Sequence, residues 1–178
     1  MSQQRAKSLL TSERGAAVIE LALVAPVLAL TVIGIVDMSN AYSRKLLLEQ
    51  GAQRAIEKIA QTTEDATVES TLANEAVCQV NGVNANGTCK TTPITTSDVT
   101  VTWSLECTDS AGATTKQQTT SSAAYDAFVC GSGTVKQARY VQVTVNSKYA
   151  PLFPIRFASF NTSDSTYHIS ATAGMRTS

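Results

Sequence analysis

The chain has 178 residues, of which 43% are hydrophobic and 16% are charged, and its formal net charge is zero. This balance excludes a strongly basic nucleic-acid-binding protein and a disordered acidic tail. The sequence has one histidine, His168, and it lacks a G-x-S-x-G motif, a glycine-rich phosphate loop and paired His/Cys ligands. We therefore expect no enzyme, no cofactor and no metal site, and we expect His168 to face solvent from a strand.

The first predicted element is an apolar run over residues 16–36, which only Glu20 and Thr31 interrupt. A run of this length can cross a lipid bilayer as a helix. A cleaved secretory signal is an alternative, because Ser39-Asn40-Ala41 resembles a small-residue cleavage site. The run is, however, longer than the usual signal core of about 7–15 residues, and it contains an acid. An uncleaved membrane anchor is the second alternative.

The charges on either side of this run predict its orientation. Arg5, Lys7 and Arg14 precede it, whereas the first cation after it is Arg44. The positive-inside rule therefore places the N-terminus in the cytoplasm and everything after Asp37 on the outer side of the membrane.

Glu20 is the unusual residue of the run, because a carboxylate at the centre of a membrane helix costs about 3 kcal/mol. A cut after Gly15 would give it a partner. Ala16 would then carry a charged amine, and residues four apart lie on the same face of a helix. The carboxylate could neutralise this amine in its own chain or in a neighbouring subunit, since opposite charges attract strongly where the dielectric constant is low.

The stretch RGAAVIELALVAPVLAL and the following GIVDMSNAY resemble the TadE-like minor pseudopilins of tight-adherence (Tad) pilus systems. Arg14-Gly15, Glu20, Pro26 and Tyr42 match the pattern of that family, whereas Leu21 stands where an aromatic residue is common. The resemblance implies cleavage between Gly15 and Ala16 by a membrane aspartic peptidase of the prepilin type. Residues 140–176 resemble the end of these proteins more weakly.

The same resemblance implies a type IV pilin-like subunit that takes part in pilus assembly and surface adhesion. Its implied partners are the prepilin peptidase, other pilin or pseudopilin subunits, the inner-membrane assembly platform and the lipid bilayer, with no nucleic acid. The implied location is the bacterial inner membrane, with the C-terminal domain in the periplasm, and an extracellular pilus after assembly. The alternative is a static single-pass anchor for a periplasmic domain of an envelope or secretion complex.

We expect one helix over residues 16–61, about 70 Å long, with a membrane-spanning part at 16–36 and an amphipathic part at 37–61. Pro26 lacks an N–H group and leaves the carbonyl of Ala22 without its helical partner, so the helix should bend there. The predicted apolar face of the second part consists of Met38, Ala41, Tyr42, Leu46, Leu48, Ala52, Ala55, Ile56 and Ile59.

Residues 1–15 are the predicted leader, and residues 62–178 should form the exported domain. Its four cysteines predict two disulfides, because their long spacings do not suit zinc. Three pairings are possible, and we expect the two short loops, Cys78–Cys89 and Cys107–Cys130.

A second helix is predicted at residues 64–77, with Thr63-Glu64-Asp65 as its N-terminus. Alternating apolar residues predict strands within 98–107, 136–149 and 166–175. Residues 110–127 should be a surface loop, and the Pro-rich stretch 149–157 should be no central strand. The prediction is an α+β fold in which the long helix packs against an antiparallel sheet of three or four strands.

Overall fold

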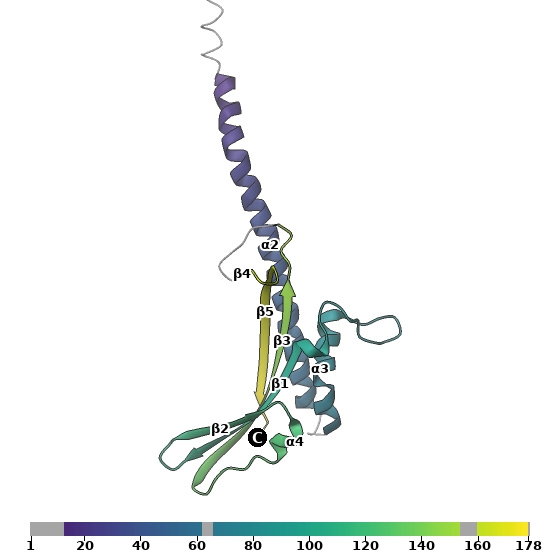
Figure 1. Ribbon diagram of the computed structural model, residues 1–178, viewed down its shortest axis with the longest axis vertical. Coiled ribbons are helices and arrows are strands. Elements are labelled where there is room, and N and C mark those ends of the chain that lie inside the picture. Colours follow the sequence, from purple (N-terminus) through teal and green to yellow (C-terminus); the bar gives the residue numbers. More distant parts are fainter. Residues whose placement is uncertain (1–12, 62–65, 154–159, 178) are drawn as a thin grey trace, which may run out of the picture.

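The computed structural model describes residues 13–61, 66–153 and 160–177 (Figure 1). Most of the predicted leader lies outside these residues, and so does the predicted start of the second helix at Thr63-Glu64-Asp65. The described chain is an α+β structure that consists of a long N-terminal helix, α2, and an antiparallel sheet, as the sequence predicts.

The helix α2 runs without a break from Glu13 to Gln61. Its first half projects away from the rest of the molecule (Figure 1). The apolar side chains along this half are exposed. Among the described residues, α2 is the one helix long and apolar enough to cross a membrane, with a mean hydropathy of 2.5 in its most apolar window.

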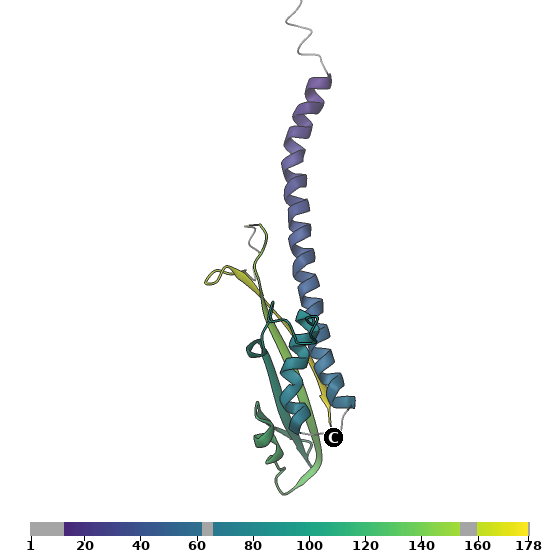
Figure 2. The same ribbon diagram turned by 90° about the vertical axis from the view of Figure 1, so that its right-hand side faces the viewer.

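Pro26 lies within α2, and the helix continues through it. Figure 2 shows that the axis of α2 is curved in its projecting half. In the same region the hydroxyl of Thr31 donates a hydrogen bond of 2.7 Å to the carbonyl oxygen of Val27, one turn earlier. This bond satisfies the threonine hydroxyl inside an apolar stretch, where an unpaired polar group would be costly.

The sheet has five strands within the described residues, in the order β2-β1-β3-β5-β4, and every neighbouring pair is antiparallel. The strands are β1 (Val99–Asp109), β2 (Thr114–Thr119), β3 (Thr134–Tyr149), β4 (Phe160–Asn161) and β5 (Thr166–Arg176). The register places Val143 of β3 opposite Val101 of β1 and Ala173 of β5, so apolar side chains of the three central strands share one face.

The predicted surface loop at 110–127 is wrong, because this stretch forms β2 and the short helix α4 (Ser122–Asp126). All six side chains of β2 are polar and none is buried, so no apolar alternation marks the strand. Backbone pairing with β1 holds it at the sheet edge. The turn before β2 is closed by Asp109, whose side chain accepts hydrogen bonds from the backbone N–H groups of Ala111 and Ala113.

The core lies between one face of the sheet and two helices, the second half of α2 and α3 (Ala66–Asn81) (Figure 2). From α2 it takes Leu48, Ala52 and Ala55, all fully buried. The predicted apolar face is wider than the buried one, because Met38, Tyr42 and Leu46 are exposed. The sheet ends beside the middle of α2, so it covers only the later turns.

The helix α3 ends four residues beyond the predicted Val77 and therefore includes Cys78. The structure joins Cys78 to Cys89 and Cys107 to Cys130. The end of α3 is fixed by the side chain of Asn81, which donates to the carbonyl oxygen of Ile94 at 2.6 Å and accepts from its N–H group at 3.1 Å. The disulfide and this amide both tie the end of the helix to the segment that leads into β1.

The helices α2 and α3 lie close together at Gly51. A methyl group there would lie 2.5 Å from Cγ2 of Val80 and 3.0 Å from the carbonyl oxygen of Ala76. Glycine in the interior of a helix normally lowers stability, so its presence here is explained by the close approach of the backbones.

We expect Gly51→Ala to destabilise the domain. Overpacking lowers the free energy of unfolding by about 1–3 kcal/mol, whereas the higher helix propensity of alanine raises it by about 1 kcal/mol at most. Denaturant unfolding, followed by the fluorescence of the buried Trp103, measures the change. Gly34→Ala in the same helix is the matched control, because nothing lies within 4 Å of its added methyl group. Equal stability of the two variants would show that α2 and α3 are not in close contact at Gly51.

Candidate functional site

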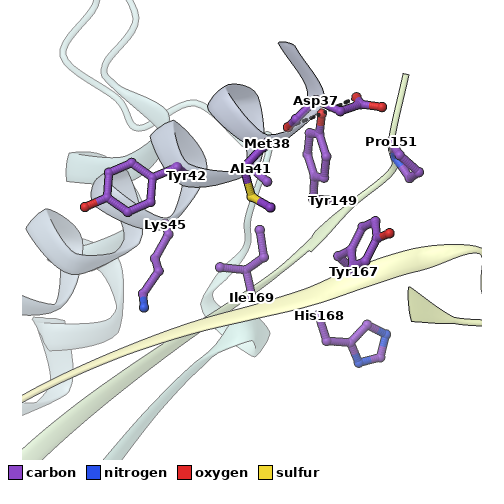
Figure 3. Close-up of a pocket in the computed structure, with 10 residues that line it drawn as sticks. All are labelled: Asp37, Met38, Ala41, Tyr42, Lys45, Tyr149, Pro151, Tyr167, His168 and Ile169. Carbon is purple, nitrogen blue, oxygen red and sulfur yellow. Dashed lines mark hydrogen bonds between the residues drawn. The ribbon is translucent and has the colours of Figure 1, made fainter. Parts of the chain in front are cut away.

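Asp37, the first charged residue after the apolar run, connects α2 to the end of β3. Its side chain is buried, with the residue only 5% exposed. The carboxylate accepts a hydrogen bond from the Tyr149 hydroxyl at 3.0 Å (Figure 3). It also accepts hydrogen bonds from the Leu152 N–H at 2.8 Å and from the Phe153 N–H at 3.2 Å. Three donors compensate for the removal of this charge from water.

These partners come from the end of β3 and the segment that follows it. Tyr149 is the last residue of β3, and the two successive N–H groups that follow Pro151 both donate to Asp37 of α2. Partial burial, together with the adjacent Asp37 carboxylate, raises the pKa of the Tyr149 hydroxyl. The hydroxyl is therefore protonated at neutral pH and donates to Asp37.

Beside Asp37 lies a pocket of about 240 Å³ between α2 and the end of the sheet. Figure 3 shows Met38 of α2 and Ile169 of β5 facing each other across it, with Tyr149 and Tyr167 on the side nearer Asp37. The other lining residues are Ala41, Tyr42, Lys45, Pro151 and His168. The walls are mostly apolar and carry no arrangement of nucleophile and base.

His168 lies on the opposite face of β5 from Ile169 (Figure 3). It is exposed, as the alternation predicts, and its Nε2 lies 2.7 Å from the carboxylate of Asp164. Hydrogen bonds, first from His168, then from Thr166 and Lys148, hold the pKa of Asp164 well below its usual range. This cluster is a surface ion pair. The described part of the chain contains no group of three or more His, Cys, Asp or Glu residues that could hold a metal.

The residues predicted to matter for processing and assembly lie elsewhere. Gly15, Ala16, Glu20 and Pro26 all belong to the projecting half of α2, away from the sheet (Figure 1). Glu20 is exposed on that half, among apolar side chains. The structure thus brings none of them to the junction, the contact at Asp37 between α2 and the end of β3.

Sequence reasoning used Asp37 only as the end of the apolar run and missed its contacts. Its partners are more than 110 positions away in the chain, and a single sequence gives no signal for such a pair. The available hint was local. A carboxylate directly beside a membrane-length run needs hydrogen-bond donors. The stretch KYAPLF supplies a tyrosine hydroxyl and, after its proline, backbone N–H groups that are not expected to pair within a strand.

The fold and the junction define a class of protein. An apolar helix projects from an α+β domain and continues into the core of that domain, an arrangement that fits a pilin-like, single-pass membrane protein.

A comparison with protein families finds a match over part of the chain. Residues 15–56 match the family model described as TadE-like protein, and the chain is TadE-like over this segment, as its resemblance predicts. No curated protein and no solved structure matches the chain.

We expect Asp37→Asn to loosen the junction. The amide keeps one oxygen but presents an N–H group to one of the present donors, and an unsatisfied buried donor costs about 1–3 kcal/mol. Hydrogen exchange at the Leu152 and Phe153 amides should accelerate, while exchange in β1 stays unchanged. Asp126→Asn, an exposed acid in α4, is the control. Unaltered protection of both amides in Asp37→Asn would refute the role assigned to this carboxylate.

Proposed function

We propose that this chain is the precursor of a TadE-like, pilin-like subunit that takes part in Tad pilus assembly and surface adhesion. The observation that carries the proposal is the family match over residues 15–56, which coincides with the helix that leaves its apolar half uncovered. A soluble domain would bury such a surface, because exposed apolar side chains are unfavourable in water.

In this proposal residues 16–36 span the bacterial inner membrane and residues 1–15 form a cytoplasmic leader. The cations Arg5, Lys7 and Arg14 support that orientation through the positive-inside rule. Residues 37–61 and 62–178 then lie in the periplasm, where the pairs Cys78–Cys89 and Cys107–Cys130 are chemically stable.

The prepilin peptidase removes the leader between Gly15 and Ala16. The new amine of Ala16 and the Glu20 carboxylate are then four residues apart on one helix, which places them on the same face. Each charge alone is unfavourable in lipid, and together they attract. The same carboxylate can instead reach the amine of an adjacent subunit, which would fix the axial offset between neighbouring helices.

Entry into a filament moves the apolar half of α2 from lipid to contact with other subunits. Helices that pack against each other in a filament keep their apolar surfaces shielded from water, so the filament core can replace the bilayer. Extraction from the membrane requires work, which the inner-membrane assembly platform supplies in this scheme. A bend at Pro26 would allow the projecting half to adjust as it leaves the bilayer.

The cleavage is tested by the intact mass of the protein from native membranes. We expect a mass that begins at Ala16. A chain that keeps residues 1–15 would instead identify a static membrane anchor of an envelope or secretion complex. A start near Tyr42 would identify a secreted domain. Either result rejects the pilin-like proposal.

The role of Glu20 is tested by Glu20→Gln, which keeps the shape of the side chain but removes its charge. We expect normal membrane insertion and a severe loss of incorporation into pili, measured by immunoblotting of sheared filaments against the membrane fraction. Glu57→Gln, near the other end of the same helix and paired with Arg54, is the matched control. Normal piliation with Glu20→Gln would reject the amine-pairing role.

A further inference from the structure

Exposed apolar side chains gather where the membrane-length part of α2 ends. Met38 and Tyr42 are 58% and 61% exposed on α2, and Leu152 is 65% exposed after β3. We call these three residues the junction patch. Tyr42 and Met38 line both the pocket beside Asp37 and a shallow groove that continues to Ile35 of the apolar run. The patch is therefore continuous with the surface proposed to face lipid.

Hydrogen bonds fix the position of Leu152 along the axis of α2. Its N–H group donates to Asp37 at 2.8 Å, and the next N–H group donates to the same carboxylate. Asp37 follows directly after Val36, the last residue of the apolar run. Figures 1 and 2 both show this end of the sheet beside the middle of α2. If residues 16–36 fill the hydrocarbon core, Leu152 lies at the boundary between lipid and water.

The residue types of the junction suit that boundary. Tyrosine rings are enriched at membrane–water interfaces, because the ring is apolar and its hydroxyl is polar. Tyr42, Tyr149 and Tyr167 surround the pocket at this level. Leu152, whose N–H group donates to Asp37, has most of its surface uncovered, which is unfavourable in water and favourable in the interfacial zone of a bilayer.

We propose that the junction patch docks the exported domain onto the outer surface of the membrane that α2 crosses. The occupant is the interfacial zone of the bilayer, and the inference rests on the membrane span proposed above. Lipid is preferred over a neighbouring subunit because α2 passes from the patch directly into the bilayer, so lipid is in contact range before any subunit arrives. The docking fixes the orientation of the sheet relative to the membrane surface, and it is released when the subunit enters a filament.

The test places a tryptophan at Leu152 in the full chain, reconstituted in phosphatidylcholine vesicles whose acyl chains carry bromine atoms near the headgroup. Bromine quenches tryptophan on contact. We expect Leu152→Trp to lose most of its added emission, measured as the difference from the wild type. The wild-type signal comes from Trp103, which is buried in the sheet and should be unaffected.

Two further variants separate the possible results. Val129→Trp, at a residue 74% exposed beside α4 at the far end of the sheet, should show no quenching. Leu28→Trp, within the apolar run, should be quenched by bromines placed deeper in the chains. An unquenched Leu152→Trp with a quenched Leu28→Trp overturns the docking and leaves the membrane span intact. If its emission then depends on protein density in the vesicles, a neighbouring subunit covers the patch instead. An unquenched Leu28→Trp overturns the span and the docking together.

Discussion

One helix has to satisfy two different environments, and the rest of the structure follows from that constraint. Residues 16–36 of α2 are apolar or small on every side except at Glu20 and Thr31, whereas the second half of the helix is apolar on one side only. The sheet and α3 cover this one side with Leu48, Ala52 and Ala55 at the centre of the contact. Because the helix is continuous, a force or rotation applied to its projecting half passes directly into the core of the domain.

Asp37 marks the point where the two environments meet. A carboxylate at this position terminates the apolar run, and it would be costly to bury without partners. Tyr149 and the following N–H groups supply those partners and attach the end of β3 to α2 at a defined height. The same residue therefore sets the end of the membrane-length segment and the position of the sheet relative to it, and the second of these roles depends on hydrogen bonds rather than on apolar packing.

Much of this fold could be predicted from local patterns. The length and apolarity of residues 16–36 indicated the projecting helix, and the alternation of Val141, Val143 and Val145 indicated β3 with the correct buried face. The strand β2 escaped prediction because its side chains are polar and its position is fixed by backbone pairing alone. The prediction assigned too many residues of α2 to the buried face, since periodicity shows which side of a helix is apolar but not how far a sheet extends along it. The contacts of Asp37 join distant parts of the chain, which local patterns do not describe.

The two borders of the sheet differ from its centre in a way that bears on how copies of the molecule can meet. At one border β2 presents Thr114, Lys116 and Gln118 along with the other polar residues of that strand. At the opposite border the two-residue β4 covers only Thr166 and Tyr167 of β5. Charged, polar or very short border strands discourage another chain from adding to a sheet. In the proposed filament, the polar border at β2 would therefore disfavour strand addition between copies, and contacts would form through the apolar helix instead.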